Sequence, residues 1–321
     1  MFVGAFDIGG TKTIIALADG NGTIVKKKQF PTKTVDCLRH VAVCCDTFRK
    51  ILQECDVGLD SVGAIGVNLP GIVDRSSGVL ERAVYAGWSD VPVGQFIQTK
   101  LSMDRVVCEN DVNSCALGEL RFGLGMKYRD FGWMTVSTGI GGAVIIDGKL
   151  IRGVNGNAGE FGHLTVEYEK PVKCPCGEYG CLEAQGSGTA INRMICDAKE
   201  RDSVFSAKFE AIDAGSDGAA LAELAKKGNA VALNIFRKVG NYIGRGIASY
   251  VNILDPEAFI IGGGVAASIS LLMPGIREAI DQCAFYAMKD IKIVQTALGY
   301  DAALIGAVTI ALSATVRKGE F

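Results

Sequence analysis

One short stretch of the sequence, residues 159–183, constrains the fold more than any other. It carries one imidazole and three thiols, a common tetrahedral ligand set for a structural zinc ion. These groups belong to His163, Cys174, Cys176 and Cys181. A proline and two glycines beside the thiols let the backbone turn tightly enough for all of them to face one ion. Free thiols or a disulfide near an unrelated histidine are the alternative, but the clustering favours zinc.

Two carboxylates flank this predicted zinc site. Glu160 lies three residues before His163, and Glu183 lies two residues after Cys181. Because four protein ligands leave no open coordination position, the metal should be structural rather than catalytic. We therefore expect zinc to fix the loops that carry Glu160 and Glu183, so that both carboxylates are held ready to bind another molecule.

The size and charge of the chain limit its possible functions. Its 321 residues are enough for two domains, each with its own core. A net charge of −2 argues against electrostatic binding of nucleic acid or of a membrane surface. Nothing near the N-terminus resembles a signal peptide, and no apolar run approaches a membrane span. Most of the eleven cysteines are scattered, which favours a reducing cytoplasm over a secreted, disulfide-bonded protein.

A glycine-rich turn follows the first apolar β-type run, residues 2–8, and precedes a second such run. The turn consists of Gly9, Gly10, Thr11 and Lys12. Glycines let backbone N–H groups converge on an anion, so this arrangement is suited to binding phosphate. Asp7, near the end of the first run, is placed to position a hydrated Mg²⁺ ion. An ordinary tight hairpin is the alternative explanation.

A second copy of this pattern lies about 130 residues further along the chain. A buried run at residues 133–138 ends in Thr138, and Gly139 begins a glycine-rich turn before another β-type run. The repetition predicts a duplicated phosphate-binding device. A third β-type run ends in Gly262 and Gly263. No Walker A sequence occurs, so a P-loop nucleotide site is not expected.

Polar residues at the end of another buried run mark a further candidate site. The run at residues 105–110 ends in Asn110, and Asp111 opens a helix-like segment. Polar side chains in this position often line the ligand crevice of an α/β sheet. The alternative is that Asp111 only caps the helix. Carboxylates accept hydrogen bonds from sugar hydroxyls and glycine turns hold phosphates, so the sequence predicts a polyol acceptor and a nucleotide donor.

Motifs along nearly the whole chain resemble those of ROK-family sugar kinases. They are DIGGTK (7–12), PGIVD (70–74), END (109–111), STGIGG (137–142), EFGH (160–163), CPCGEYGCLE (174–183) and IIGGG (260–264). The resemblance implies an α/β, two-domain actin-like ATPase fold of the ribonuclease H-like type. Residues 1–112 and 301–321 would form the smaller domain, and residues 113–300 the larger one with the zinc knuckle.

The resemblance also implies a role for each candidate residue. Asp111 would be the catalytic general base, and Asn110 would bind the sugar beside it. Glu160, Glu183 and His163 would contact other sugar hydroxyls, while His163 also ligates zinc. ATP would be bound through Gly9, Gly10, Thr11, Lys12, Thr138, Gly139, Gly262 and Gly263. The implied cofactors are ATP, Mg²⁺ and structural Zn²⁺.

The expected substrate is a hexose or N-acetylhexosamine phosphorylated at its C6 hydroxyl, with glucose and N-acetylmannosamine as the leading candidates. Many family glucokinases carry an asparagine in a segment resembling APNLGW. This chain has AVYAGW at residues 83–88, with Tyr85 in place of that asparagine, which weakens the case for glucose. The family also implies a homodimer. The charge, the cysteine pattern and the lack of a long apolar run indicate a cytoplasmic protein that binds neither nucleic acid nor a membrane.

Two other functions compete with the kinase. The ROK family includes sugar-responsive repressors, but those carry an N-terminal helix-turn-helix, whereas the first phosphate-binding strand here begins at residue 2. The spacing Gly262-x-Gly264-x-x-Ala267 also fits an NAD-dependent dehydrogenase. That function would leave the zinc knuckle and both glycine hairpins unexplained.

Overall fold

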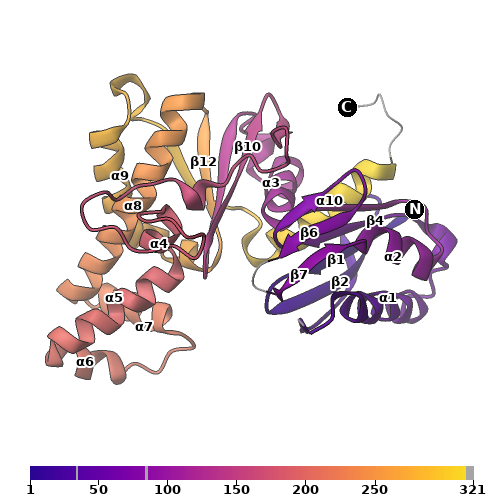
Figure 1. Cartoon of the computed structure of the whole chain (residues 1–321), viewed down its shortest axis with the longest axis horizontal. Helices are drawn as coiled ribbons and strands as arrows, with labels where there is room; N and C mark the ends of the chain where they lie inside the picture. Colours follow the sequence, from indigo (N-terminus) through magenta and orange to yellow (C-terminus); the bar gives the residue numbers. More distant parts are fainter. Residues whose placement is uncertain (34, 84–85, 316–321) are drawn as a thin grey trace. The chain divides into compact units, whose positions relative to one another are not determined.

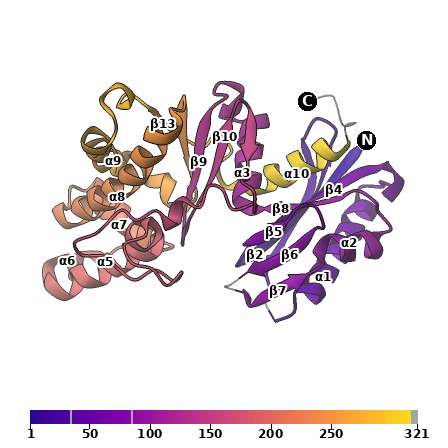
Figure 2. The ribbon, with the colours of Figure 1, turned by 45° about the horizontal axis from the view of Figure 1, so that its top comes forward.

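The computed structural model describes residues 1–33, 35–83 and 86–315 of the chain. The chain forms two compact units, each with its own β-sheet (Figures 1 and 2). Unit 1 comprises Met1–Arg129, Gly148–Ala158 and Thr296–Phe321, and unit 2 comprises Asp130–Asp147 and Gly159–Gln295.

The main sheet of unit 1 has the strand order β3-β2-β1-β4-β8. Its strands are β1 (Phe2–Ile8), β2 (Lys12–Asp19), β3 (Ile24–Pro31), β4 (Val62–Leu69) and β8 (Val106–Asn110). Strands β1, β2 and β3 form an antiparallel meander, whereas β1, β4 and β8 run parallel. The carboxyl ends of the three parallel strands therefore meet at one edge of the sheet.

Helices cover both faces of this sheet (Figure 1). α1 (Cys37–Glu54) and α2 (Val93–Leu101) pack on one face, and α10 (Ala302–Thr315) packs on the other with α3 (Asp111–Phe122) against it. Side chains along β1 alternate between the two cores, as the pleat requires. Phe6 packs against Phe48 of α1, with 5.4 Å between the ring centroids. Ala5 instead joins Ala307 of α10.

Unit 1 also contains a small antiparallel sheet of order β5-β6-β7. Its strands are β5 (Ile72–Asp74), β6 (Val79–Ala83) and β7 (Trp88–Val91). The remaining short elements of this unit are η1 (Leu59–Ser61), η3 (Leu124–Met126), β11 (Lys149–Ile151) and η7 (Gly299–Asp301). η1 directly precedes β4, so it lies at the amino-terminal edge of the main sheet, opposite the carboxyl ends of the parallel strands.

The sheet of unit 2 repeats the topology of the first. It contains β9 (Phe131–Val136), β10 (Ile140–Ile146), β12 (Ala258–Gly262) and β13 (Lys292–Gln295). Their order, β10-β9-β12-β13, matches β2-β1-β4-β8, with β9 and β10 antiparallel and β9, β12 and β13 parallel. The structure thus confirms the two strand–turn–strand hairpins that the sequence predicts.

Helices make up most of the rest of unit 2. They are α4 (Leu182–Gly186), α5 (Gly188–Arg201), α6 (Ser203–Glu210), α7 (Asp217–Lys226), α8 (Ala230–Leu254) and α9 (Ile269–Cys283), with the short η4 (Phe161–His163), η5 (Gly264–Ser268) and η6 (Tyr286–Met288). α8 packs along α9, and a Cβ on Gly240 would lie only 2.1 Å from the Leu272 carbonyl oxygen. Glycine therefore permits the close contact between these helices.

The division into units differs from the domain boundaries expected from the sequence, at residues 112 and 300. Unit 1 includes α3, because α3 packs against α10, and it also includes residues 148–158. It resumes at Thr296 rather than at residue 301. Of the helices among the described residues, none combines the length and apolar character needed to cross a lipid bilayer.

Candidate active site

Polar side chains gather at the carboxyl ends of the parallel strands in unit 1. Asp7 of β1 pairs with Asn68 of β4, and Leu69 of β4 pairs with Asn110 at the end of β8. Asp111 follows directly as the first residue of α3. In open α/β sheets this edge is where ligands bind. The sequence-predicted residues of this unit are therefore brought to one place.

Asp7 is a buried carboxylate with 7% of its surface exposed. Asn68 Nδ2 donates hydrogen bonds to Asp7 Oδ1 at 3.3 Å and to the Ala303 carbonyl, which orients the carboxylate. Burial raises the pKa of Asp7 to about 6, against the lowering effects of the Asn68 hydrogen bond and of the Lys12 charge. At neutral pH the carboxylate is therefore ionised, although at a cost to folding.

The surroundings of Asp7 fit a hydrated Mg²⁺ ion. Asn68 Oδ1 is buried and has no hydrogen-bond partner among the described residues, so a second oxygen acceptor lies beside the Asp7 carboxylate. Mg²⁺ prefers oxygen ligands and keeps several of its waters, which could donate to such an acceptor. These two side chains are the part of unit 1 that would hold the metal.

Replacing Asp7 by asparagine should stabilise the protein at neutral pH. The folded state keeps the Asp7 proton up to about pH 6, while the unfolded chain loses it near 3.8, so stability is lost as the pH rises through this window. The substituted amide would not titrate and could still accept from Asn68. We expect a gain of about 3 kcal/mol in the free energy of unfolding at pH 7.5.

Denaturant unfolding of both proteins in EDTA measures this gain. It should shrink to about 1 kcal/mol at pH 4.5, where the wild-type carboxyl is mostly protonated in the folded state. An Asp7→Asn protein that is no more stable than wild type at pH 7.5 would contradict the burial cost assigned to this carboxylate.

The first glycine turn follows β1 and is accessible at its tip. Gly9 N donates to Lys12 O at 3.0 Å, and Thr32 N donates to Thr11 O at 3.0 Å, so backbone hydrogen bonds hold the turn. Gly10, Thr11 and Lys12 are exposed. A fixed backbone with an exposed tip and a lysine is suited to binding an anion.

Asn110, rather than Asp111, caps α3. Asn110 Oδ1 accepts hydrogen bonds from the backbone N of Val112 at 2.9 Å and of Asn113 at 3.0 Å, and its Nδ2 donates to Gly71 O at 3.0 Å. Asp111 is the first helical residue, is half-buried, and accepts from Val112 N through Oδ1 at 2.9 Å. The N-cap alternative for Asp111 is therefore wrong. The first turn of a helix is a favourable position for a negatively charged side chain.

A buried carboxylate, Glu109, supports this helix start. Arg152 Nε and Nη2 donate to Glu109 Oε2 at 2.9 and 2.8 Å, and Arg75 Nε lies 3.5 Å from the same oxygen. Glu109 Oε1 accepts from Asn110 N and from Asn113 Nδ2, each at 3.2 Å. The charge of Glu109 is thus paired, and its second oxygen fixes the first turn of α3.

Asn68, Glu109 and Arg152 are not among the site residues predicted from the sequence. Two of them could have been found from the sequence, since Asn68 is the next-to-last residue of an apolar run, as Asp7 is, and Glu109 lies in the END motif. Arg152 could not, because its partner lies 43 residues away in the sequence.

In unit 2 the second and third glycine turns lie side by side, because β9 and β12 are adjacent parallel strands. β9 ends at Val136, just before Thr138 and Gly139, and β12 ends at Gly262. Gly263 has a φ of +87°, and a Cβ there would lie 2.4 Å from the Val136 carbonyl oxygen. Only glycine fits this position, so the backbone of the third turn can lie directly against the end of β9.

Glu183, in the first turn of α4, contacts the second glycine turn. Its Oε2 accepts from Ile140 N at 2.9 Å, and a Cβ on Gly139 would lie 2.4 Å from the same oxygen. Glycine at 139 therefore lets the carboxylate approach the backbone. Thr189 Oγ1 donates to Thr138 O at 2.8 Å, which ties the start of α5 to this turn.

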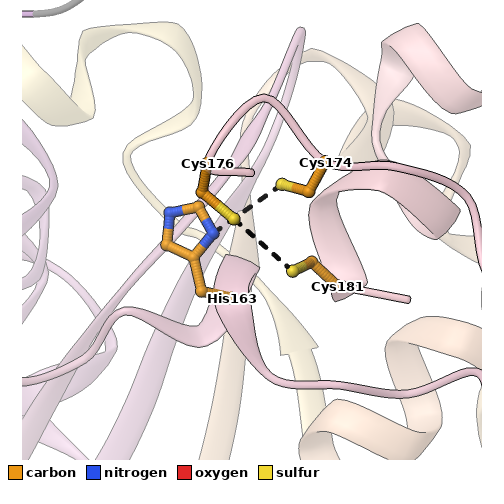
Figure 3. A group of neighbouring side chains, drawn as sticks. All are labelled: His163, Cys174, Cys176 and Cys181. Carbon is orange, nitrogen blue, oxygen red and sulfur yellow. Dashed lines mark hydrogen bonds between the residues drawn. The ribbon is translucent and has the colours of Figure 1, made fainter. Parts of the chain in front are cut away.

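The four predicted zinc ligands lie together in unit 2 (Figure 3). Their ligand atoms all lie within 4.8 Å of one another, with 3.7 Å between the Cys176 and Cys181 sulfurs and 3.9 Å between Cys174 Sγ and His163 Nδ1. Two sulfurs bound to one tetrahedral zinc ion would be about 3.8 Å apart. A disulfide would require about 2 Å. The geometry fits zinc and excludes a disulfide between Cys176 and Cys181.

The two flanking carboxylates lie close to this cluster. His163 Nδ1 faces the thiols, and His163 Nε2 lies 3.9 Å from Glu160 Oε2. Gly162 lies against Glu183, since a Cβ on Gly162 would be 3.5 Å from the Glu183 Cβ. Glu160 is exposed and Glu183 is half-buried. The segments that carry both acids thus adjoin the cluster, while Tyr85, the predicted sugar-selecting position of unit 1, lies outside the described residues.

Comparison with known proteins gives consistent matches. A family model described as the ROK family matches residues 3–314. A glucokinase from Halalkalibacterium halodurans is 32% identical over 306 residues, which cover 94% of this chain and 92% of that protein. A xylose repressor from Caldicellulosiruptor bescii is also 32% identical, over 86% of this chain and 69% of the repressor.

A solved structure extends this likeness to three dimensions. The crystal structure of a ROK family glucokinase from Streptomyces griseus, in complex with glucose and AMPPNP, matches with a TM-score of 0.81 and 29% identity. The match covers 98% of this chain and 100% of that one. The similarity is therefore not confined to one unit.

Proposed function

The chain belongs to the ROK family, and from this premise we propose that it transfers a phosphoryl group from ATP to the C6 hydroxyl of a hexose or N-acetylhexosamine. It has the α/β actin-like ATPase fold and is an ATP-dependent sugar kinase. The observation that carries the finer proposal is the gathering of Asp7, Asn110 and Asp111 at one sheet edge, beside an accessible glycine turn.

Asp111 is the proposed general base. Its carboxylate would accept the proton of the attacking hydroxyl while that oxygen bonds to the γ-phosphorus and the bond to the ADP oxygen breaks. Asn110 would bind the sugar next to Asp111. Its helix-capping hydrogen bonds hold its side chain in a fixed position for that contact. Glu109, held by Arg152, supports the same turn and is assigned a positioning role.

Phosphoryl transfer requires positioning and charge stabilisation more than covalent chemistry from the protein. We assign the ATP phosphates to Gly9, Gly10, Thr11, Lys12, Thr138 and Gly139, and the adenosine to Gly262 and Gly263. Mg²⁺, when bound near Asp7, neutralises the charge of the phosphates. The buried oxygen acceptors of Asp7 and Asn68 support the placement of Mg²⁺ at this position.

The proposed sugar contacts in unit 2 are Glu160, Glu183 and His163. Ionised carboxylates accept hydrogen bonds from hydroxyl groups, and the negative charge of the acceptor strengthens each of these hydrogen bonds. The cluster of His163 with the three thiols supports a structural zinc ion that keeps these acids in place. We also propose a homodimer in the cytoplasm, where the thiols stay reduced and able to bind metal.

An ADP-release assay tests the function and identifies the sugar. Glucose, mannose, N-acetylglucosamine, N-acetylmannosamine and fructose would each be supplied with ATP and Mg²⁺, and phosphorus NMR of the product would locate the phosphate. We expect turnover with glucose or N-acetylmannosamine and a C6 phosphate. Lack of turnover with every sugar would reject the kinase, and NADH formation in a parallel assay with NAD would support the dehydrogenase.

A sugar-responsive repressor is the second candidate, favoured by the 32% identity to a xylose repressor. A regulator would bind sugar without releasing ADP. Calorimetry with the same five sugars separates the two functions, because a kinase must both bind and turn over its substrate.

A further inference from the structure

A buried histidine without a role in the proposed chemistry is linked to the first glycine turn by hydrogen bonds. His40, on α1, is 3% exposed. Its Nε2 lies 2.7 Å from Thr13 Oγ1, and Thr13 Oγ1 lies 2.8 Å from Thr32 Oγ1. Thr32 Oγ1 donates to the Gly9 carbonyl oxygen at 2.8 Å. Three side chains thus connect the helix to the first residue of the turn.

The direction of every hydrogen bond in this chain follows from counting hydrogens. A hydroxyl has one hydrogen, so Thr32, which donates to Gly9, must accept from Thr13. Thr13 has then used its hydrogen and must accept from His40. His40 therefore carries a hydrogen on Nε2.

The hydrogen bond at the other ring nitrogen, Nδ1, agrees with a hydrogen on Nε2. Lys33 N donates to His40 Nδ1 at 3.4 Å, so Nδ1 is an acceptor and the ring is neutral. Burial, with a further effect of the Lys33 charge, lowers the pKa of His40 and favours this neutral form. The ring packs against Phe30 and Trp88, with 5.7 and 6.3 Å between ring centroids, and these contacts limit its rotation.

Thr32 holds the turn at two points. Its backbone N donates to Thr11 O at 3.0 Å, and its hydroxyl donates to Gly9 O. A turn that binds an anion through backbone N–H groups works best when its geometry is fixed before the ligand arrives. The carbonyl of Gly9 belongs to the peptide group whose N–H is that of Gly10, so holding that oxygen also sets the direction of the Gly10 N–H.

We propose that His40, Thr13 and Thr32 are positioning residues that hold the Gly9–Gly10 peptide in the orientation that binds the nucleotide phosphates. The inference rests on the proposed function, which assigns ATP to this turn. None of the three side chains needs to touch the nucleotide, since they act through the Gly9 carbonyl. Their loss should therefore weaken nucleotide binding and leave sugar binding unchanged.

The test compares Thr32→Val, which keeps the shape of the side chain but removes the hydroxyl, with Thr32→Ser, which keeps the hydroxyl. We expect the KM for ATP to rise about tenfold in Thr32→Val and to stay near the wild-type value in Thr32→Ser. The KM for the sugar should not change in either variant. Affinity for a non-hydrolysable ATP analogue, measured by calorimetry, should fall by the same factor.

Thr309→Val is the matched control. Thr309 is a buried threonine of the same unit, and its hydroxyl donates only to Ile305 O within α10 at 2.8 Å. If Thr32→Val fails to fold, His40→Gln, whose amide can still donate to Thr13, is compared with His40→Leu, which cannot donate. The loss of nucleotide affinity is then expected only in His40→Leu.

The outcomes separate this inference from the function on which it rests. A wild-type protein that neither binds the ATP analogue nor releases ADP overturns both. A wild-type protein that turns over, with Thr32→Val or His40→Leu no weaker for ATP than Thr309→Val, overturns only the positioning role. Selective loss of ATP affinity, rescued in Thr32→Ser, supports it.

Discussion

Replacing Asp111 by asparagine should lower kcat by roughly a hundredfold to ten-thousandfold, the range that general-base catalysis contributes. The amide cannot accept the proton of the attacking hydroxyl, but it has nearly the same size and can still accept from Val112 N, as Asp111 does. The KM values for sugar and ATP should therefore change little. Steady-state kinetics with the sugar identified by the ADP-release assay measure both effects.

Asp60→Asn is the control for this experiment. It makes the same substitution on an exposed residue of η1, at the amino-terminal edge of the same sheet. Its kcat should equal that of the wild type. If Asp111→Asn retained more than a tenth of wild-type turnover, Asp111 would not be the base.

The second large effect should come from the thiol cluster. In Cys176→Ser a hydroxyl replaces one of the three sulfurs, and the loss of this ligand should release the zinc ion and free the segments that carry Glu160 and Glu183. Mutating a residue that holds a binding site in place without touching the ligand typically weakens affinity or activity by about tenfold to a hundredfold. We expect the KM for sugar to rise by that amount, with a smaller effect on the KM for ATP.

Metal analysis and kinetics would be carried out on the same preparations. Cys196→Ser is the matched control, because Cys196 is an exposed cysteine of unit 2 outside the cluster. Wild type and control should each contain about one zinc ion per chain, as a single four-ligand site requires. Absence of zinc from the wild type would reject the metal site. Loss of zinc with an unchanged KM for sugar would instead reject its role in holding the carboxylates.

The features that could be predicted from the sequence are those encoded locally. The four thiol and imidazole groups lie within 19 residues, and Gly/Pro turns bring them together without help from distant segments. The two glycine hairpins are likewise contiguous, and their repetition in the sequence became a repeated sheet topology. The ends of the strands could therefore be located, and with them Asp7 and Asn110.

What the sequence could not supply depends on contacts between distant residues. Asn68 meets Asp7 only because β1 and β4 pair in parallel, and Arg152 reaches Glu109 from a segment that follows β10 and β11. Whether Asp111 caps α3 depended on where the helix starts, and the structure starts it at Asp111 with Asn110 as the cap. The unit to which α3 belongs was set by its packing on α10.

The two edges of the first sheet are chemically unequal, and this has a practical use. The ends of β1, β4 and β8 carry Asp7, Asn68 and Asn110, the residues proposed to hold Mg²⁺ and the sugar. The starts of β4 and β8 are joined to exposed turns around Asp60 and Asp104, which contribute no group to the proposed reaction. A fluorescent reporter or an immobilisation tag inserted there would track the enzyme without disturbing its turnover.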